Sequence, residues 1–495
     1  MSEKTVGARG LIMNEPLIFE QGSPGRVACA LPPGGIAEKR PEDLLPEDHV
    51  RKEIQGLPEV SEIDVVRHYT RLSQWNYGID LGFYPLGSCT MKYNPKINED
   101  LATLSGFSQT HPYQGQTSSQ GILRLMYELQ EMLAKIVGLE AVSLQPSAGA
   151  HGELTGMLMI HAYHADRGRP RSKVIIPDSA HGTNPASSAL CKYRALSLKS
   201  DARGLISPKT LAETMDEDVA ALILTNPNTL GLFEEDILKV TEIVRAKGGL
   251  VYCDGANLNA LTGIAQFGDM GVDVVHMNLH KTFSTPHGGG GPGSGPIAVG
   301  ERLAPYLPVP IVGKEGDQYM LVNDRPKSIG RIRAFYGSVG VLIRAYAYIL
   351  TMGPEGLKQA AEVAVVNANY LRAKLKQCYY LPYDRICKHE CVFSDKHQMS
   401  RGVQTIHIAK RLMDYGFHPP TIYFPLVVPG ALMIEPTETE SKETLDQFVA
   451  AMEAIDRETR ESPDVVIGAP TKTKATRLDE TQAARFPCLT WCGLE

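Results

Sequence analysis

The sequence lacks the features that mark membrane, secreted and nucleic-acid-binding proteins. The candidate membrane segment, residues 334–343, lies between Arg333 and Arg344, and no uncharged apolar run approaches the roughly 18 residues that a membrane helix needs. The net charge is only −6, so no overall positive field attracts nucleic acid or an anionic membrane. Glu3 and Lys4 precede any apolar stretch, which does not fit a signal peptide. These absences predict a soluble, cytoplasmic protein that binds neither nucleic acid nor membrane.

Cysteine is also scarce. Nine Cys in 495 residues are too few, and odd in number, for a disulfide-stabilised secreted protein. Cys387, His389 and Cys391 form one cluster, and Cys488 and Cys492 form a pair. Neither has C-x-x-C spacing and they lie about 100 residues apart, so no metal site is predicted.

The composition is that of a globular protein, with 43% hydrophobic and 21% charged residues. The length is enough for about two or three domains. Residues 1–80 are rich in proline and charge and predict an N-terminal arm that wraps a neighbouring subunit, with a flexible tail as the alternative. We expect a large domain over 81–345, a smaller α+β domain over 346–462 and a weakly ordered tail over 463–495.

The segment 81–345 has the pattern of an α/β domain with a mostly parallel sheet. Apolar residues recur at helical spacing over 122–136, and Gly138 follows as a stop signal. Short apolar runs separated by helical segments, such as 234–246, predict strands that are buried on both faces. The predicted strands are residues 142–144, 174–176, 219–224, 250–252, 272–275 and 296–299.

The pattern changes after residue 345. Helical segments are predicted over 357–375, 405–415 and 442–459, around a proline-rich extended piece at 418–435. This mixture indicates the smaller α+β domain.

An ionisable pair follows two of the predicted strands. Ligands of an open parallel sheet bind at the carboxyl ends of its strands, and Asp254 and Lys281 lie directly after such ends, 27 residues apart. A lysine that forms a Schiff base and a carboxylate that keeps a pyridine nitrogen protonated are what an electron-sink cofactor needs. A surface salt bridge is the alternative. It is disfavoured because Lys281 lies between the apolar run 272–277 and the glycine-rich run 288–295.

One turn is a candidate for phosphate binding, and a glycine-rich run is not. Ser147, Ala148 and Gly149 lie between a predicted strand and a predicted helix at 152–165, where free backbone N–H groups and the helix dipole favour an anion. The glycine run 288–295 fits a nucleotide-binding spacing but does not open a helix after a strand. We interpret it as a flexible wall beside the active site.

Several long motifs closely resemble the P-protein of the glycine cleavage system, a pyridoxal-phosphate-dependent glycine decarboxylase family. They lie at residues 85–95, 145–153, 179–187, 254–260, 278–293, 419–425 and 435–441. The resemblance extends over residues 60–450 and implies a fold-type I, aminotransferase-like enzyme. The length resembles subunit 2, the lysine-bearing C-terminal half-chain of the two-subunit bacterial form. Cys391 departs from the family pattern, which has Phe at this position.

The resemblance implies catalytic roles for three residues. Lys281 would hold pyridoxal 5'-phosphate covalently as a Schiff base and then shuttle protons. Asp254 would pair with the pyridinium nitrogen. His181 would stack on the cofactor ring, although a histidine that caps a turn is the alternative.

Further cofactor contacts follow from the same resemblance. They are assigned to Ser147, Ala148, Gly149, Asn226, His280 and Thr282. The residues at 147–149 would hold the phosphate with Thr282, and Asn226 would contact the ring hydroxyl. Ser88, Cys89 and Thr90 would line the substrate side, unless they form only a structural turn.

The activity implied by the resemblance is the decarboxylation of glycine, with transfer of the remaining aminomethyl group to the lipoyl arm of the H-protein. The implied partner is P-protein subunit 1 in an α2β2 assembly. Another fold-type I reaction, transamination or decarboxylation of a larger amino acid, remains the alternative. A non-catalytic partner chain is disfavoured because both Lys281 and Asp254 are present. Arg331 and Arg333 are the nearest candidates for the glycine carboxylate, and neither is assigned.

Overall fold

A computed structural model describes the chain except residues 1–14, 52–55, 288–292, 337 and 490–495. The chain divides into two compact units, one drawn from residues 1–81 and 470–495 and the other from Gly82–Ala469. In the described part of the first unit, the α-helices are α1 (Glu62–Ser73) and α15 (Glu480–Arg485). No helix in the described residues is long and apolar enough to cross a membrane.

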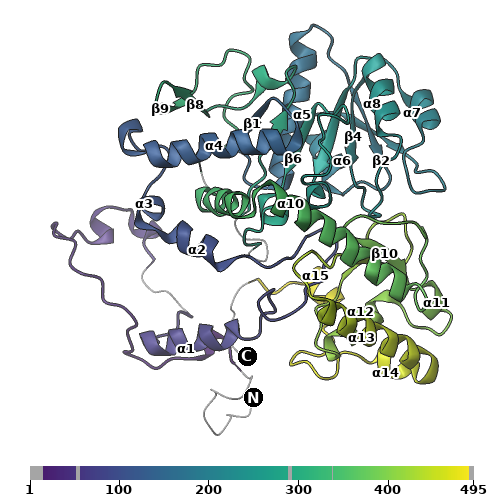
Figure 1. Ribbon diagram of the computed structural model, residues 1–495. Coiled ribbons are helices and arrows are strands. Elements are labelled where there is room, and N and C mark those ends of the chain that lie inside the picture. The colour runs from purple at the N-terminus through teal and green to yellow at the C-terminus, as the bar shows by residue number, and fades with distance from the viewer. Residues whose placement is uncertain (1–14, 52–55, 288–292, 337, 490–495) are drawn as a thin grey trace. The chain divides into compact units, whose positions relative to one another are not determined.

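The second unit is built on a seven-stranded sheet, shown in Figure 1. Its strands are β1 (Ala141–Ser143), β2 (Lys173–Pro177), β3 (Arg194–Leu198), β4 (Val219–Thr225), β5 (Leu250–Gly255), β6 (Val274–Met277) and β7 (Ile297–Val299). The strand order is β1-β7-β6-β5-β4-β2-β3. β2 pairs in parallel with β3 and β4, as β5 does with β4 and β6, and only β7 runs antiparallel to its neighbours. The predicted α/β class with a mostly parallel sheet is confirmed.

Apolar cores cover both faces of this sheet. On one face, Ile223 of β4 packs in the same cluster as Met157 of α5 (Gly149–Asp166). On the other face, Leu222 packs with Leu133 of α4 (Gln120–Val137). Complete burial of such a side chain contributes about 1.5–3 kcal/mol. Because successive side chains of β4 point to opposite faces, this strand stabilises the packing of helices on both sides of the sheet.

The large sheet region contains further helices and one hairpin. They are α2 (Lys96–Thr103), α3 (Ser105–Ser108), α6 (Thr183–Leu190), α7 (Pro208–Thr214), α8 (Ile237–Ala246), α9 (Leu279–Thr282), and the hairpin of β8 (Ile311–Glu315) and β9 (Gln318–Val322).

All six predicted strands are present, and β3 of this sheet and the hairpin strands β8 and β9 were missed. β3 pairs only with β2, and most of its side chains are exposed or half-buried. An edge strand of this kind has no continuous apolar run, which was the signal used to find the others. The predicted helix stop is also confirmed, because Gly138 takes a left-handed conformation (φ 71°) after α4.

The C-terminal part of the second unit is a smaller α+β layer. Its elements are α10 (Val339–Leu375), α11 (Lys396–Met399), α12 (Thr405–Asp414), α13 (Lys442–Glu461), α14 (Pro463–Ile467) and the strands β10 (Cys391–Ser394), β11 (Thr421–Ile422) and β12 (Ala431–Ile434). α10 is kinked at Gly353, which precedes Pro354. Residues 463–469 fall in the predicted tail but pack on this core, where Val466 is fully buried. The other predicted domain limits stay predictions.

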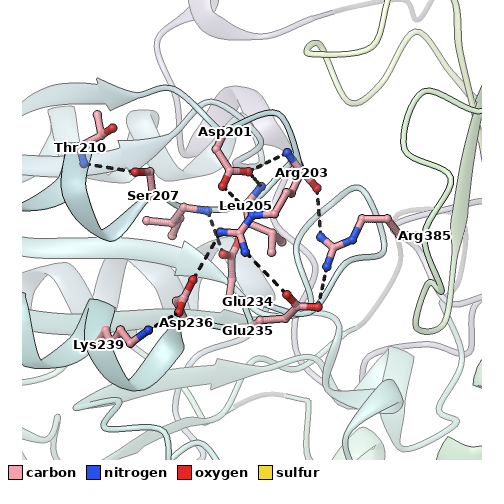
Figure 2. Close-up of polar contacts among 12 residues, drawn as sticks. Asp201, Arg203, Leu205, Ser207, Thr210, Glu234, Glu235, Asp236, Lys239 and Arg385 are labelled. Atoms are coloured by element: carbon pink, nitrogen blue, oxygen red, sulfur yellow. Dashed lines mark hydrogen bonds and ion pairs between the residues drawn. The ribbon is translucent and has the colours of Figure 1, made fainter.

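A charged cluster joins the smaller layer to the loop that precedes α7 (Figure 2). Arg385 contacts the Glu235 carboxylate at 2.5 Å and donates to the Arg203 carbonyl at 3.2 Å. Arg203 also reaches Asp236, at 3.4 Å. These groups are exposed or partly exposed, so they orient the loop more than they stabilise the fold.

Candidate active site

A cavity of about 280 Å³ lies where the carboxyl ends of the strands meet. It is lined by Ser88, Cys89, Gly149, Ala150, Glu153, His181, Thr183, Thr225, Thr229, Asp254, Ala256, Asn257, His276, Asn278, His280, Lys281 and His287. The structure therefore brings together five of the predicted site residues, namely Lys281, Asp254, His181, His280 and Gly149. Ser88 and Cys89 also line the cavity, as expected for the substrate side.

Lys281 is presented to the cavity by α9, a single helical turn that follows β6. Leu279 and Phe283 flank it and are fully buried, which anchors the turn in the core. The Lys281 side chain is itself buried, and its amine donates a hydrogen bond to the Ser88 carbonyl at 2.7 Å. The amine is thereby held at the cavity wall.

Asp254 lies near the end of β5 and is almost completely buried. Its Oδ1 accepts a hydrogen bond from the Ala256 amide at 2.9 Å and lies 3.4 Å from His276 Nε2. Burial by itself raises the pKa of Asp254, but His276, the Ala256 amide and the charge of Lys281 outweigh it, so the net pKa is lowered. Asp254 is therefore a carboxylate at neutral pH.

His181 belongs to a hydrogen-bond chain that ends on Glu153. The Thr183 amide donates to His181 Nδ1 at 3.2 Å, and the Thr183 hydroxyl donates to Glu153 at 2.8 Å. Because Nδ1 accepts from an amide, the proton of the neutral imidazole lies on Nε2. The His181 ring remains open to solvent, yet partial desolvation lowers its pKa, which favours this neutral form.

Glu153 provides a pH-dependent readout of the site. Burial, followed by the charge of Asp254, raises the pKa of Glu153 from 4.5 to about 7. The protonated group therefore contributes stability that is fully present below pH 4.5 and is lost as the pH rises through about 7. We expect Glu153→Gln, which mimics the protonated acid, to gain about 3 kcal/mol relative to the native chain across this window.

Thermal unfolding of cofactor-free protein at a series of pH values would measure this effect. Glu217→Gln, a change of the same type at an exposed position, is the control and should follow the native curve. Parallel curves for Glu153→Gln and the native chain would contradict the prediction.

Some predicted cofactor contacts do not line the cavity. The Asn226 side-chain oxygen accepts a hydrogen bond from the Glu234 amide at 3.1 Å, and its nitrogen lies 3.6 Å from the Met270 sulfur. These contacts stabilise the turn after β4. Ser147 contacts the ring of His151, on the first turn of α5. Ala148 and Thr282 are also outside the lining, so contacts from these four residues stay predictions.

The start of α5 leaves room and donors for an anion. α5 begins at Gly149, and no side chain caps it, so backbone N–H groups of its first turn are available. A Cβ on Gly149 would lie 2.7 Å from Asn278 Oδ1, so glycine is needed for this close approach. The hydroxyl of Thr282 and the Oδ1 of Asn278 are buried without hydrogen-bond partners. Residues 288–292 of the predicted glycine wall lie outside the described residues.

Sequence reasoning missed several residues that line the cavity. They are Glu153, Thr183, Thr225, Thr229, Asn257, His276, Asn278 and His287. Most lie at or just after the carboxyl ends of β4, β5 and β6, and the sequence alone does not separate side chains that line a cavity from those that pack in the core. Burial lowers the pKa of His280 to about 3 and that of His287 to about 4, so both rings are neutral.

Comparison with known sequences decides the family. Residues 360–474 match the family glycine dehydrogenase, C-terminal domain, and residues 152–290 match aminotransferase class-V. The probable glycine dehydrogenase (decarboxylating) subunit 2 of Caldanaerobacter subterraneus subsp. tengcongensis is 57% identical over 476 residues, which cover 96% of this chain and 98% of that protein. The protein of the same name from Exiguobacterium sibiricum is 58% identical over 476 residues, with 96% and 97% covered.

The chain belongs to the glycine dehydrogenase (decarboxylating) subunit 2 family. This confirms the resemblance to the P-protein half-chain. Membership of the subunit 2 family implies a partner subunit, and together with the class-V aminotransferase match it implies a pyridoxal-phosphate cofactor.

Solved structures support the fold of this subunit 2 family member. The crystal structure of glycine decarboxylase (P-protein) of the glycine cleavage system, in inhibitor-bound form, matches with a TM-score of 0.72 at 22% identity. The match covers 84% of this chain and 95% of that one. Sphingosine-1-phosphate lyase of Burkholderia pseudomallei matches with a TM-score of 0.62 at 14% identity, covering 85% and 96%.

Proposed function

We propose that this chain decarboxylates glycine with pyridoxal 5'-phosphate bound at Lys281, and passes the remaining aminomethyl group to the lipoyl arm of the H-protein. The observation that carries the proposal is that the buried Lys281 amine and the Asp254 carboxylate face one cavity. The relatives named glycine dehydrogenase (decarboxylating) subunit 2, similar over 96% of the chain, support glycine as the substrate.

The residues of the cavity fit this cofactor. Lys281 would hold it, Asp254 would face its ring nitrogen and His181 would cover the ring. The uncapped start of α5 and the unpartnered Thr282 hydroxyl would take the phosphate. Buried polar atoms without partners are rare, so their presence here supports a bound group of complementary polarity.

When bound, the cofactor supplies a protonated pyridine ring that accepts the electron pair left as carbon dioxide departs from glycine. The ionised Asp254 would hold a proton on the ring nitrogen, which keeps the ring an electron sink. The Lys281 amine would carry a proton to or from the reacting carbon. The neutral His181 would orient the ring from its face.

The cavity is suited to the release of a carboxylate. His280 and His287 are neutral, as the directions of their pKa shifts require. Arg331 donates to Asn323, Arg333 donates to the Gln145 carbonyl, and no arginine occurs among the described residues of the lining. Strong binding of the group to be expelled would stabilise the ground state alone, so the lack of a cationic clamp favours decarboxylation.

We expect activity to need two partners in the cytoplasm, subunit 1 in an α2β2 assembly and the lipoylated H-protein. Exchange of carbon between glycine and bicarbonate, with lipoylated H-protein and with or without subunit 1, tests this. Exchange should occur only with both partners present. Exchange without subunit 1 would contradict the half-chain assignment, and turnover of larger amino acids without a lipoyl carrier would support the alternative fold-type I reaction.

A further inference from the structure

Two completely buried carboxyl groups lie near Lys281, outside the cavity lining. Glu390 directly precedes β10 and Glu435 directly follows β12, and both side chains have no exposed surface. β10 and β12 are antiparallel, with Cys391 opposite Ile434, so Glu390 and Glu435 are the next facing pair in this register. Side chains opposite each other in an antiparallel pair point to the same face, which explains why the two carboxyls are close.

Both carboxyls bind the backbone of the turn that contacts Lys281. The Ser88 amide donates to Glu390 at 2.8 Å, and the Thr90 amide donates to Glu435 at 3.1 Å. Ser88 and Thr90 have positive φ angles of 64° and 40°, a conformation that costs energy for residues with a side chain. The carboxyls therefore hold a turn that would not keep this shape alone, and the Ser88 carbonyl accepts the Lys281 amine at 2.7 Å.

Burial and mutual repulsion disfavour two carboxylates in this pair. Burial raises the pKa of Glu390 well above its usual value, the charge of Glu435 adds to this, and burial also raises the pKa of Glu435. The titratable groups around them are Lys281, His389 and the thiols of Cys89, Cys387 and Cys391. Burial lowers the pKa of His389 to about 3 and raises the pKa of each thiol, so Lys281 is the one cation among these groups. One positive charge balances one carboxylate.

We propose that Glu390 and Glu435 share one proton and together position the Ser88–Thr90 turn and the Lys281 amine. The inference rests on the proposed function because it takes Lys281 as the cofactor-binding residue. It adds two positioning residues from the C-terminal layer, neither of which lines the cavity.

Glutamine variants test the shared proton in the full-length chain loaded with pyridoxal phosphate. The readout is the pH midpoint of the visible absorbance band of the lysine-bound cofactor. If the pair carries one proton, a single Glu390→Gln or Glu435→Gln substitution leaves the other glutamate as the one carboxylate. The net charge of the pair is unchanged, so each single variant should keep the native midpoint. The double variant removes the remaining negative charge and should lower the midpoint by about one pH unit.

The alternatives give different results in the same titration. If each single variant lowered the pH midpoint by the same amount, both glutamates would be charged in the native protein, and the proposal would be overturned. An unchanged midpoint in the double variant would overturn it as well. Glu234→Gln is the matched control, since Glu234 is a buried carboxyl whose pKa is also raised by burial, to about 7, but which binds the Ile206 amide instead of this turn.

Two further measurements keep the test independent of how well the variants fold. The native protein at neutral pH should show an infrared band of a protonated carboxyl, and its absence would overturn the shared proton. Metal analysis should find no divalent ion, although His389, Glu390 and Glu435 have ligand atoms within 4.8 Å of one another. A stoichiometric ion that is lost in Glu435→Gln would overturn the proposal.

Positioning has its own readout in hydrogen exchange. Glu435→Ala should speed amide exchange at Thr90, whereas Glu435→Gln retains an acceptor and should preserve protection. Equal protection in both variants would contradict the positioning role. These spectra need no glycine, so a failure of glycine exchange in the native protein would refute the proposed function while the titration still decides the carboxyl pair.

Discussion

Lys281→Ala should abolish the visible absorbance band of bound pyridoxal phosphate and lower glycine exchange by about 10²–10⁴-fold or more. The reason is that Lys281 is the one lysine that lines the cavity formed by the described residues, and we propose that it is both the covalent anchor and the proton carrier. Absorbance spectroscopy after cofactor loading and the exchange assay measure the two effects separately.

Lys239→Ala is the control for this experiment. Lys239 lies on α8, is largely exposed and pairs with Asp236, so its loss should change neither the band nor the exchange rate. A band that survives in Lys281→Ala would show that another group holds the cofactor.

Asp254→Asn should retain the cofactor but lower the exchange rate by about 10²–10³-fold. Asparagine keeps the shape and the contact with the Ala256 amide but removes the charge that we propose holds a proton on the ring nitrogen. Without that proton, the ring accepts electrons poorly. The measurement is the exchange rate per bound cofactor, with cofactor content determined by absorbance.

Asp273→Asn separates this electronic effect from lost stability. Asp273 is also a buried carboxyl, but it binds the Val251 amide and Arg302 instead of lining the cavity. This control should lower the melting temperature and leave the rate per bound cofactor unchanged. A similar rate loss in both variants would argue against a special role for Asp254.

The sheet could be predicted from the sequence because its strands are buried on both faces. Continuous apolar runs such as 219–224, separated by helical segments, are typical of the inner strands of a parallel sheet. β3 could not be found in this way, because an edge strand needs no apolar side chains on its open face. The packing of Val466 was equally hidden, since a five-residue helix has too short a pattern to reveal its buried side.

The cavity could be predicted in part. Topology alone places Asp254 and Lys281 at one edge, because the strands that precede them, β5 and β6, are parallel neighbours. Asn226 was assigned through the family resemblance, and its contact with the cofactor stays a prediction; its carboxamide accepts a local hydrogen bond from the Glu234 amide, which the sequence does not reveal. Glu153 and Thr183 were missed because their link to His181 depends on how α5 lies beside α6.

The contacts around Lys281 also depend on parts of the chain that are made late. The hydrogen bonds that fix the Ser88–Thr90 turn span 302 residues to Glu390 and 345 residues to Glu435. On the ribosome, the sheet strands and Lys281 are made well before these glutamates. A nascent chain therefore cannot form both hydrogen bonds of the Ser88–Thr90 turn until Glu435 has emerged. A chain released before that point would contain Lys281 but lack the carboxyl groups that hold this turn.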